Sequence, residues 1–266
     1  MRIATWNVNS LRSRIDRVEA LLDRHEIDVL ALQETKARED QLPLMGLQGR
    51  GYDVAAAGTS QWNGVAIISR VGLDDVQVGF EGMPGFAKDA AGPLDAEARA
   101  IGAVCGGVRL WSLYVPNGRK VDDPHYVYKL EWLARLRAAA TAWSGEDAAL
   151  VGDWNIAPLD EDVFDMAQFK TSTHVTPPER AAFQAFLDDG YVEVTRPHTP
   201  GPDVYTYWDY YRQRFERNRG LRIDFVLGSP SLAARVTGAF IDTDERDPAQ
   251  GTGSPSDHAP VIVDLV

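Results

Sequence analysis

Four short polar strings, each at one end of a strongly apolar run, constrain the possible fold of this chain most. They are Thr5-Trp6-Asn7, Gln33-Glu34-Thr35, Gly152-Asp153-Trp154-Asn155 and Ser256-Asp257-His258-Ala259-Pro260. Apolar runs of about four to eight residues, bounded by polar residues, are typical of buried strands. The strings therefore put carboxylate, carboxamide and imidazole groups where strands enter or leave a sheet.

The remaining pattern predicts a layered α/β fold. Apolar residues recur at helical spacing over residues 11–25, and Asp123-Pro124 has the form of a helix start. Thr176-Pro177-Pro178-Glu179 has the form of a capping box for a helix that Gly190 ends. Strands are expected over residues 3–8, 27–32, 64–69, 98–105, 108–115, 148–152, 191–195, 222–227, 236–241 and 260–265. Several of them are apolar on both faces, which favours sheets that are covered by helices.

We expect one α/β domain that spans residues 1–266, because no repeat, low-complexity tract or linker divides the chain. Residues 81–97 and 242–256 are rich in Gly, Pro and Asp and are expected to be surface loops. The single cysteine, Cys105, lies in an apolar run and is expected to be a small buried side chain. No apolar run is long enough to span a bilayer, and Met1 leads straight into a strand without a signal peptide. These features predict a cytoplasmic protein with no membrane partner.

The charge distribution carries a second signal. The formal net charge of −12 disfavours general attraction to nucleic acid, but a binding face is a local property. Residues 196–222 carry six arginines against three acidic residues, and aromatic residues alternate with these arginines. Aromatic faces stack on bases, and arginines neutralise phosphates. A core-facing strand followed by a solvated helix would explain the aromatic residues equally well, but the arginines favour a nucleic-acid face.

Five residues of the polar strings, Asn7, Glu34, Asp153, Asn155 and Asp257, offer oxygen ligands that suit a hard divalent cation such as Mg²⁺ or Mn²⁺. Asp153 and Asn155 are two residues apart, so in an extended segment both side chains point to the same side. Simpler structural interpretations exist for each feature. An acid after a buried strand often belongs to the solvated rim, and an Asp-x-Asn string often forms an Asx turn.

His258 supplies a group that carries charge near pH 7, next to the Asp257 carboxylate. A second acid, Asp224, interrupts an apolar strand pattern, where a carboxylate is costly unless it is paired. We therefore expect Asp224 to orient His258 and to raise its pKa. Tyr114 also ends a strand, where its phenol would either pack or face a phosphate. The other histidines, among them His174, lack such a context and are expected to be surface or packing residues. Together these groups favour a metal-dependent phosphoesterase.

Seven strings, nearly end to end and in one order, closely resemble the exonuclease III family of bacterial AP endonucleases, a branch of the DNase I-like superfamily. The strings are Ala4-Thr5-Trp6-Asn7-Val8-Asn9-Ser10, Leu32-Gln33-Glu34-Thr35-Lys36, Asn63-Gly64-Val65-Ala66-Ile67, Tyr114-Val115-Pro116-Asn117-Gly118, Gly152-Asp153-Trp154-Asn155, Gly220-Leu221-Arg222-Ile223-Asp224 and Ser256-Asp257-His258-Ala259-Pro260. The resemblance implies a four-layer α-β-β-α sandwich of two mixed sheets, packed face to face and flanked by helices. It also implies cleavage of duplex DNA 5′ to abasic sites, 3′→5′ exonuclease action and removal of 3′-blocking groups by a monomer.

The resemblance also implies roles for individual residues. Glu34 would be the principal ligand of Mg²⁺, or of Mn²⁺ in its place, with Asn7 and Asp257 close to the same ion. Asp153 would orient or deprotonate the attacking water, and Asn155 would hold the phosphate.

Two further groups of roles follow from the same resemblance. His258, supported by Asp224, would polarise a phosphate oxygen, and Tyr114 would contact the phosphate or assist the leaving group. The pocket for an extruded abasic sugar would involve substrate-binding residues at four positions: Tyr207, Trp208, Leu221 and Arg222.

The chain departs from the family pattern in two places. Gly253-Ser254-Pro255 stands where relatives often carry a basic residue, and the preceding loop, residues 242–247, is acidic, so weaker DNA binding is expected. Asn9 stands where the animal branch has an acid, which favours one tightly held metal ion over two.

Two alternatives to this function stay open. One is a phosphoesterase of the same fold that acts on inositol phosphates, sphingomyelin or RNA, and the other is a catalytically silent DNA-end binder.

Overall fold

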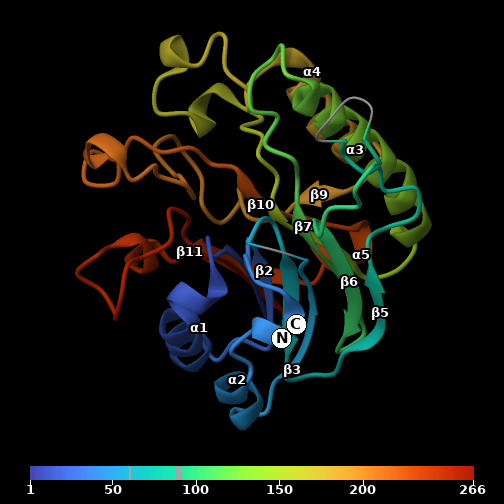
Figure 1. Ribbon diagram of the computed structural model, residues 1–266, viewed down its shortest axis with the longest axis vertical. Coiled ribbons are helices and arrows are strands. Elements are labelled where there is room, and N and C mark those ends of the chain that lie inside the picture. Colours follow the sequence, from blue (N-terminus) through green and yellow to red (C-terminus); the bar gives the residue numbers. More distant parts are fainter. Residues whose placement is uncertain (60, 88–91) are drawn as a thin grey trace.

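The structure, a computed structural model, describes residues 1–59, 61–87 and 92–266. Within these residues the strands form two six-stranded sheets (Figure 1). The first sheet has the order β11 (Val236–Ile241), β12 (Val261–Leu265), β1 (Arg2–Asn7), β2 (Val29–Gln33), β4 (Val65–Ser69) and β3 (Asp53–Ala57). The second sheet has the order β5 (Asp74–Val78), β6 (Ala100–Cys105), β7 (Val108–Tyr114), β8 (Ala148–Asp153), β10 (Asp224–Gly228) and β9 (Val192–Glu193).

Both sheets are mixed and share one plan. The central pairs β1–β2 and β7–β8 are parallel, and all other neighbouring strands are antiparallel. Small and β-branched side chains such as Ala31, Val65, Ala103 and Val151 fill the space between the sheets. The strands that are apolar on both faces are buried on both sides, as the sequence pattern predicts.

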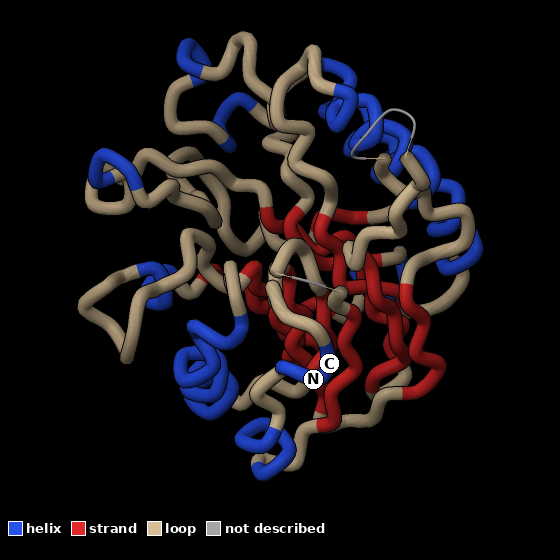
Figure 2. The backbone as a smooth tube through the Cα atoms, viewed as in Figure 1, coloured by secondary structure: helices blue, strands red, loops and turns tan. Residues whose placement is uncertain are grey.

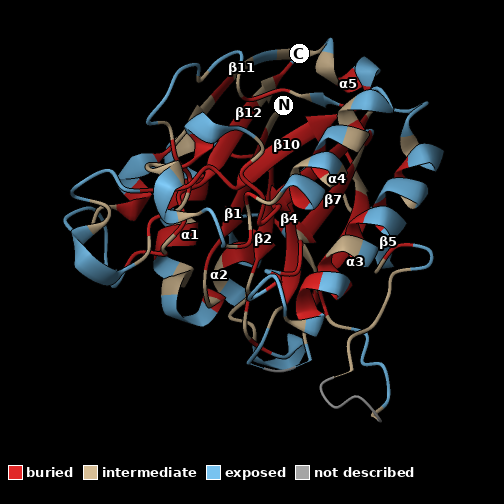
Figure 3. Ribbon diagram, turned by 90° about the horizontal axis from the view of Figure 1, so that it is seen from above, coloured by how far each residue is buried: buried red, intermediate tan, exposed pale blue. Residues whose placement is uncertain are grey.

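Helices cover the two outer faces (Figures 1 and 2). On the first sheet, α1 (Leu11–His25) and α2 (Met45–Gly49) pack with apolar side chains such as Leu21 and Leu47. On the second sheet, α3 (Pro124–Ala140) and α4 (Pro177–Asp188) pack with Trp132, Phe183 and Phe186. Figure 3 shows this burial pattern, with buried strands in the middle and helices exposed on their outer sides. The four-layer α-β-β-α sandwich is therefore confirmed.

Shorter helical segments complete the described elements. They are α5 (Pro230–Ala233) and the 3₁₀ turns Glu39–Gln41, Thr141–Trp143, Asp160–Asp162, Met166–Gln168, Tyr211–Gln213 and Thr243–Arg246. None of the helices that the structure describes is long and apolar enough to cross a membrane.

Most expected elements are present, with shifted ends, and the helix starts are formed as predicted. The Asp123 carboxylate accepts from the backbone N–H of His125 at 2.8 Å, and Thr176 and Glu179 form the reciprocal capping box of α4. Cys105 is fully buried. The strand expected over residues 191–195 shortens to the two residues of β9.

Two strands and two α-helices of the described residues are absent from the sequence expectation: β3, β5, α2 and α5. β5 is exposed along its whole length and lies at a sheet edge, so its sequence lacks the apolar run of a buried strand. β3 is rich in alanine, which is depleted in strands. Of the expected loop over residues 81–97, residues 88–91 lie outside the described residues.

A chain of buried polar side chains fixes the two sheets relative to each other. The Gln33 amide donates to Thr5 Oγ1 within the first sheet and to Ser112 Oγ in the second, both at 3.0 Å. Ser112 Oγ donates in turn to the carbonyl of Leu32 at 2.9 Å. These directional contacts cross an otherwise apolar interface, so they define how the ends of the two sheets align.

We predict that Gly152→Ala disrupts the pairing of β7 with β8. A Cβ at Gly152 would lie 2.0 Å from the Leu113 carbonyl oxygen, and the residue has a φ of +144°. The clash is with backbone, so the cost should be at least about 3 kcal/mol. Urea unfolding measures this loss. Gly145→Ala is the control, because a Cβ there has no neighbour within 4 Å and its cost should stay within about 0.5 kcal/mol. Equal stability of both variants would contradict this packing.

Candidate active site

The candidate side chains meet because strand pairing brings one end of each sheet to the same place. Asn7 ends β1, and Glu34 directly follows the parallel neighbour β2. In the second sheet, Asp153 at the end of β8 pairs with both Tyr114 of β7 and Asp224 of β10. Residues distant in sequence therefore gather at one edge of the sandwich.

A polar cavity of about 140 Å³ lies at this edge. Its lining comes from both sheets and from the loops that follow them: Glu34, Tyr114, Asn117, Asp153, Asn155, His174, Tyr207, Ile223, Asp257 and His258. The segment of Asp257 and His258 reaches the cavity because β12 begins antiparallel to the end of β1, with Val261 opposite Thr5. Three of the four polar strings thus line one cavity. Asn7, from the remaining string, does not line it but donates hydrogen bonds to Glu34 and Asp153.

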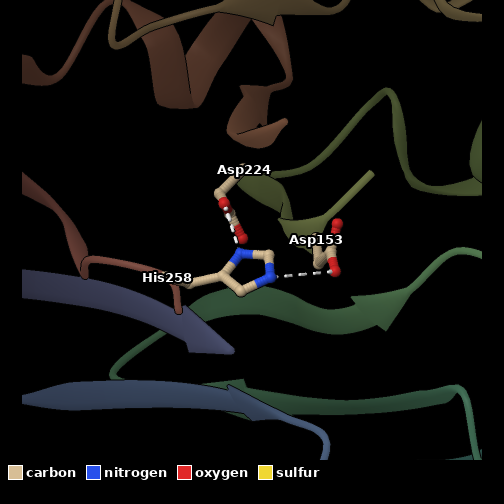
Figure 4. Close-up of side chains that lie close together, drawn as sticks. All are labelled: Asp153, Asp224 and His258. Carbon is tan, nitrogen blue, oxygen red and sulfur yellow. Dashed lines mark hydrogen bonds and ion pairs between the residues drawn. The ribbon is translucent and has the colours of Figure 1, made fainter. Parts of the chain in front are cut away.

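His258 is buried between two carboxylates (Figure 4). Its Nδ1 lies 2.9 Å from Asp224 Oδ2, and its Nε2 lies 3.9 Å from Asp153 Oδ2. Burial acts to lower the pKa of His258, but the carboxylates of Asp224, Asp153 and Asp257 outweigh it and raise the pKa to about 10. His258 is therefore an imidazolium at neutral pH, and both ring nitrogens are donors.

Asp153 is an acid with a raised pKa. Burial, together with the negative charges of Asp224 and Glu34, raises the pKa of Asp153 to about 7 against the opposing effect of His258. Its Oδ1 accepts from the backbone N–H of Asn155 at 2.9 Å, and its Oδ2 accepts from the Asn7 amide at 3.0 Å. A carboxylate with a pKa near neutrality is matched to taking a proton from water.

Glu34 is held as a carboxylate by two donors. The Asn7 amide donates to Oε1 at 2.9 Å, and the Lys36 ammonium lies 2.7 Å from Oε2. Burial acts to raise the pKa of Glu34, but Lys36, Asn7 and the charge of His258 outweigh it, so the pKa is lowered. The backbone of Glu34 is left-handed, with a φ of 53°, as are Lys36 and Asn9. Such conformations are strained for residues other than glycine and cluster at functional sites.

Asp257 and Tyr114 complete the polar lining of the cavity. Asp257 Oδ1 accepts from the Asn9 amide at 3.0 Å. The guanidinium of Arg99 lies over the Tyr114 ring, 4.7 Å from its centre. Burial and the neighbouring Glu34 carboxylate raise the pKa of Tyr114 well above its ordinary value, so the phenol stays protonated and is a donor.

Asn155 is fixed by hydrogen bonds on every side. Its side-chain amide donates to the Val115 carbonyl at 3.0 Å, and its Oδ1 accepts from the Asn117 amide at 3.1 Å. Its backbone carbonyl accepts from Lys129 Nζ at 2.6 Å and contacts His174 Nδ1 at 2.5 Å. These contacts hold a left-handed residue with a φ of 51°.

The carboxylates of Glu34, Asp153 and Asp257 fit a divalent cation. All three residues line the same small polar cavity, and burial, together with the charges of Asp224 and Glu34, raises the pKa of Asp153. Ligand atoms of Asp153, Asp224 and His258 also lie within 4.8 Å of one another. His258 Nδ1 is committed to Asp224 at 2.9 Å, however, and a hard divalent cation prefers oxygen ligands, so the carboxylates are the better ligands.

The sequence prediction that Asn7 and Asn155 both offer oxygen to a metal ion stays a prediction, and their contacts in the structure are as follows. The Asn7 amide nitrogen faces Glu34 and Asp153, and its Oδ1 accepts from the Asn9 backbone at 3.0 Å. Asn155 Oδ1 already accepts from Asn117. In this arrangement the Asn7 amide orients the carboxylates of Glu34 and Asp153, and the oxygen of each asparagine accepts one hydrogen bond within the protein.

The structure brings only part of the expected substrate pocket to the cavity. The Tyr207 ring lines it, with its centre 4.8 Å from that of His258. Leu221 is buried and pairs with the Tyr207 backbone.

The predictions that Trp208 and Arg222 line the substrate pocket are wrong about their positions. Trp208 is buried in a separate cluster, and its indole N–H donates to Asn218 at 3.1 Å. Arg222 is buried, and its guanidinium donates to Thr195 and Thr199.

Internal contacts also revise the charge interpretation. Arg196, the first arginine of the basic segment, pairs with the buried Asp162 at 2.9 Å, so it is not free to meet a phosphate. In the acidic loop, Arg24 lies 2.7 Å from Asp242 and 2.5 Å from Glu245. The buried guanidinium of Arg17 donates to several backbone carbonyls between residues 245 and 253. This loop is therefore anchored, and two of its acids are already neutralised.

Sequence reasoning missed His174, Asn117 and Lys129, which surround Asn155. His174 was expected at the surface or in packing, but it lines the cavity. Burial and the nearby Lys129 lower the pKa of His174 to about 4, so it is neutral. No local motif surrounds His174, but Asn117 stands inside a string that the family resemblance had marked, and that position was a usable signal.

Known proteins share both the sequence pattern and the fold. The endonuclease/exonuclease/phosphatase family profile matches residues 4–258. Exodeoxyribonuclease III from Haemophilus influenzae is 28% identical over 276 residues, covering 98% of each chain. An AP endonuclease from Archaeoglobus fulgidus superposes with a TM-score of 0.90 at 34% identity, covering 100% of this chain and 99% of that one.

A second solved structure is informative about ligands. The 3′ phosphatase NExo from Neisseria, bound to a product DNA hairpin, is similar with a TM-score of 0.91 at 36% identity, covering 100% of this chain and 99% of that one. Both the sequence profile and the superpositions extend over nearly the whole chain. The chain belongs to the endonuclease/exonuclease/phosphatase family, and within it to the exonuclease III family.

Proposed function

We propose that this protein is a metal-dependent nuclease of duplex DNA that cleaves 5′ to abasic sites and trims or cleans 3′ ends. The observation that supports this most is the shared cavity of Glu34, Asp153, Asp257 and His258. Three carboxylates and one imidazolium can supply the metal ligands, the general base and the charged donor for hydrolysis of a phosphate ester. Mg²⁺ is the expected cation, and Mn²⁺ should replace it.

The side chains divide the chemistry between them. Asp153, with a pKa of about 7, takes the proton of the attacking water. The His258 imidazolium donates to a phosphate oxygen, and Asn155 donates to the charge that develops at phosphorus. The protonated phenol of Tyr114 donates to the phosphate or to the leaving oxygen. A divalent cation held by Glu34 and Asp257 would supply charge stabilisation at the phosphate and the leaving 3′-oxygen.

DNA is the substrate class that the similarities favour. The relatives named above are an exodeoxyribonuclease, an AP endonuclease and a 3′ phosphatase, and the last was solved with a DNA hairpin. A phosphatase of soluble inositol phosphates would have the same fold, but none of the relatives named above is described as such an enzyme. The silent-scaffold alternative is disfavoured, because every acid and imidazole of the reaction is present in the cavity. A single catalytic domain over residues 1–266, a monomeric state and a cytoplasmic location complete the proposal.

The proposal predicts incision of a duplex that carries one abasic analogue, in the presence of Mg²⁺ or Mn²⁺ and not with chelator. Glu34→Gln keeps the size of the side chain but removes its charge, so it should lower the incision rate about 100-fold or more. Gel assays with labelled duplex measure both effects. Hydrolysis of inositol phosphate with no action on DNA would overturn the proposal, and metal-independent DNA binding without cleavage would support the silent alternative.

We predict that Asn155→Ala lowers kcat by about 10² to 10³ and changes substrate affinity little, because the lost donor acts on charge that forms in the transition state. Backbone strain is a possible confounder, since Asn155 has a φ of 51°. Asn155→Gly removes the same side chain and tolerates this conformation. Both variants should lose kcat alike in steady-state assays, whereas equal losses in kcat and affinity would contradict the role.

The pH profile should depend on Asp224. His258 has a raised pKa of about 10, so the imidazolium is fully present below its ordinary pKa of 6.5 and is lost only as the pH rises through about 10. Asp224→Asn removes a principal cause of that increase. The alkaline limb of kcat/KM should therefore move to lower pH, with about tenfold loss per unit above the new pKa. NMR titration of the His258 ring in metal-free protein is the direct check. An unchanged limb and an unchanged pKa would contradict the assignment.

A further inference from the structure

The backbone of Asn155 is held from outside the cavity by a buried ion pair. Lys129 lies on α3 and Glu179 on α4, and both side chains have no exposed surface. Lys129 Nζ donates to the Asn155 carbonyl at 2.6 Å, to the Asn117 carbonyl at 3.4 Å and to Glu179 Oε1. An ammonium has three donors, so every one of them is used.

Glu179 is itself fixed by the start of α4. Its Oε1 also accepts from the His174 backbone at 2.9 Å, and its Oε2 accepts from the backbone and hydroxyl of Thr176 at 3.1 and 2.7 Å. This is the capping box of the helix, so the position of the carboxylate follows from the helix terminus. The helix terminus thereby sets where the Lys129 ammonium lies.

Asn155 needs such support because of its conformation. A left-handed backbone at an asparagine costs free energy and persists only when its surroundings enforce it. The Asn155 side chain reaches the cavity, but its carbonyl points towards Lys129 and His174. The contacts of Lys129 and His174 with the Asn155 carbonyl therefore hold the backbone in the orientation that points the Asn155 side chain to the cavity.

The chemistry of the Lys129–Glu179 pair also indicates that it positions Asn155 and adds little to the stability of the fold. A buried ion pair contributes little net stability, and a neutral pair of similar volume is often as stable. A neutral pair without donors would leave the carbonyls of Asn155 and Asn117 without the ammonium that binds both. We propose that Lys129 and Glu179 are positioning residues that hold Asn155 in register for phosphate cleavage. This inference rests on the function proposed above.

The test compares two neutralised ion pairs between the same helices. Lys129→Met/Glu179→Gln removes the buried pair, and Arg137→Met/Asp189→Asn removes an exposed pair, 2.6 Å apart, that joins α3 to the end of α4. The first variant should lose kcat about tenfold or more on abasic duplex, with KM within about twofold, and the second should match wild type. An equal loss in both variants, or a loss only in KM, would overturn the inference.

A double-mutant cycle separates positioning from general structure. In an Asn155→Gly background the side chain to be positioned is gone, so neutralising Lys129 and Glu179 should cost little further kcat. Additive losses would overturn the inference. Should the neutral variant fail to fold, Lys129→Arg keeps the charge but changes the donor geometry, and it should lower kcat with the same KM. Wild-type kinetics in Lys129→Arg would then count against the role.

Hydrogen exchange, which does not depend on catalysis, tests the positioning role separately from the proposed function. The Asn155 backbone N–H donates to Asp153 at 2.9 Å, so its hydrogen exchange reports how firmly the residue is held. Exchange at Asn155 should be faster in Lys129→Met/Glu179→Gln and unchanged in Arg137→Met/Asp189→Asn. Unchanged exchange in both would overturn the positioning role even if wild type cleaves DNA. Lack of DNA cleavage by wild type would instead count against the function alone.

Discussion

The site depends on acidic side chains being held close together against their mutual repulsion. Glu34, Asp153 and Asp257 line one cavity of about 140 Å³ with the His258 imidazolium, and burial together with the charges of Asp224 and Glu34 raises the pKa of Asp153 to about 7. Carboxylates gathered in one small buried cavity need a rigid frame and a compensating positive charge. The frame is the pair of sheets, and the compensation comes from His258, from Lys36 and, in the proposed function, from a divalent ion.

Hydrogen bonds between buried polar side chains set the relative position of the two sheets and of the site residues. The contacts of Gln33 with both sheets fix how their ends align, so that Asp153 lies within reach of the Asn7 amide. Outside the sheets, the Lys129–Glu179 pair performs a similar task for the loop that follows β8. In both cases a buried polar group, costly when unpaired, gives direction where apolar contacts would give none.

Local sequence patterns predicted a layered α/β domain with polar site residues at strand ends, whereas the four-layer sandwich was implied by the resemblance to the exonuclease III family. Apolar runs mark buried strands, and the acids at their ends must share an edge once the strands pair. Trp208 and Arg222 were misplaced, because adjacency in a string says nothing about which way a loop residue points after packing. His174 and Lys129 were missed for the opposite reason: they reach Asn155 only through the tertiary approach of α3 and α4. A string identifies a site residue but not the groups that support it.

The central claim is that the carboxylates of this one cavity together hold a divalent cation. Anomalous diffraction from crystals soaked in Mn²⁺ measures this without any assay of turnover. The account predicts a manganese peak within bonding distance of the Glu34 carboxylate, and loss of that peak in crystals of Glu34→Gln. A cavity without the ion at saturating manganese, or an ion bound elsewhere on the chain alone, would contradict the account.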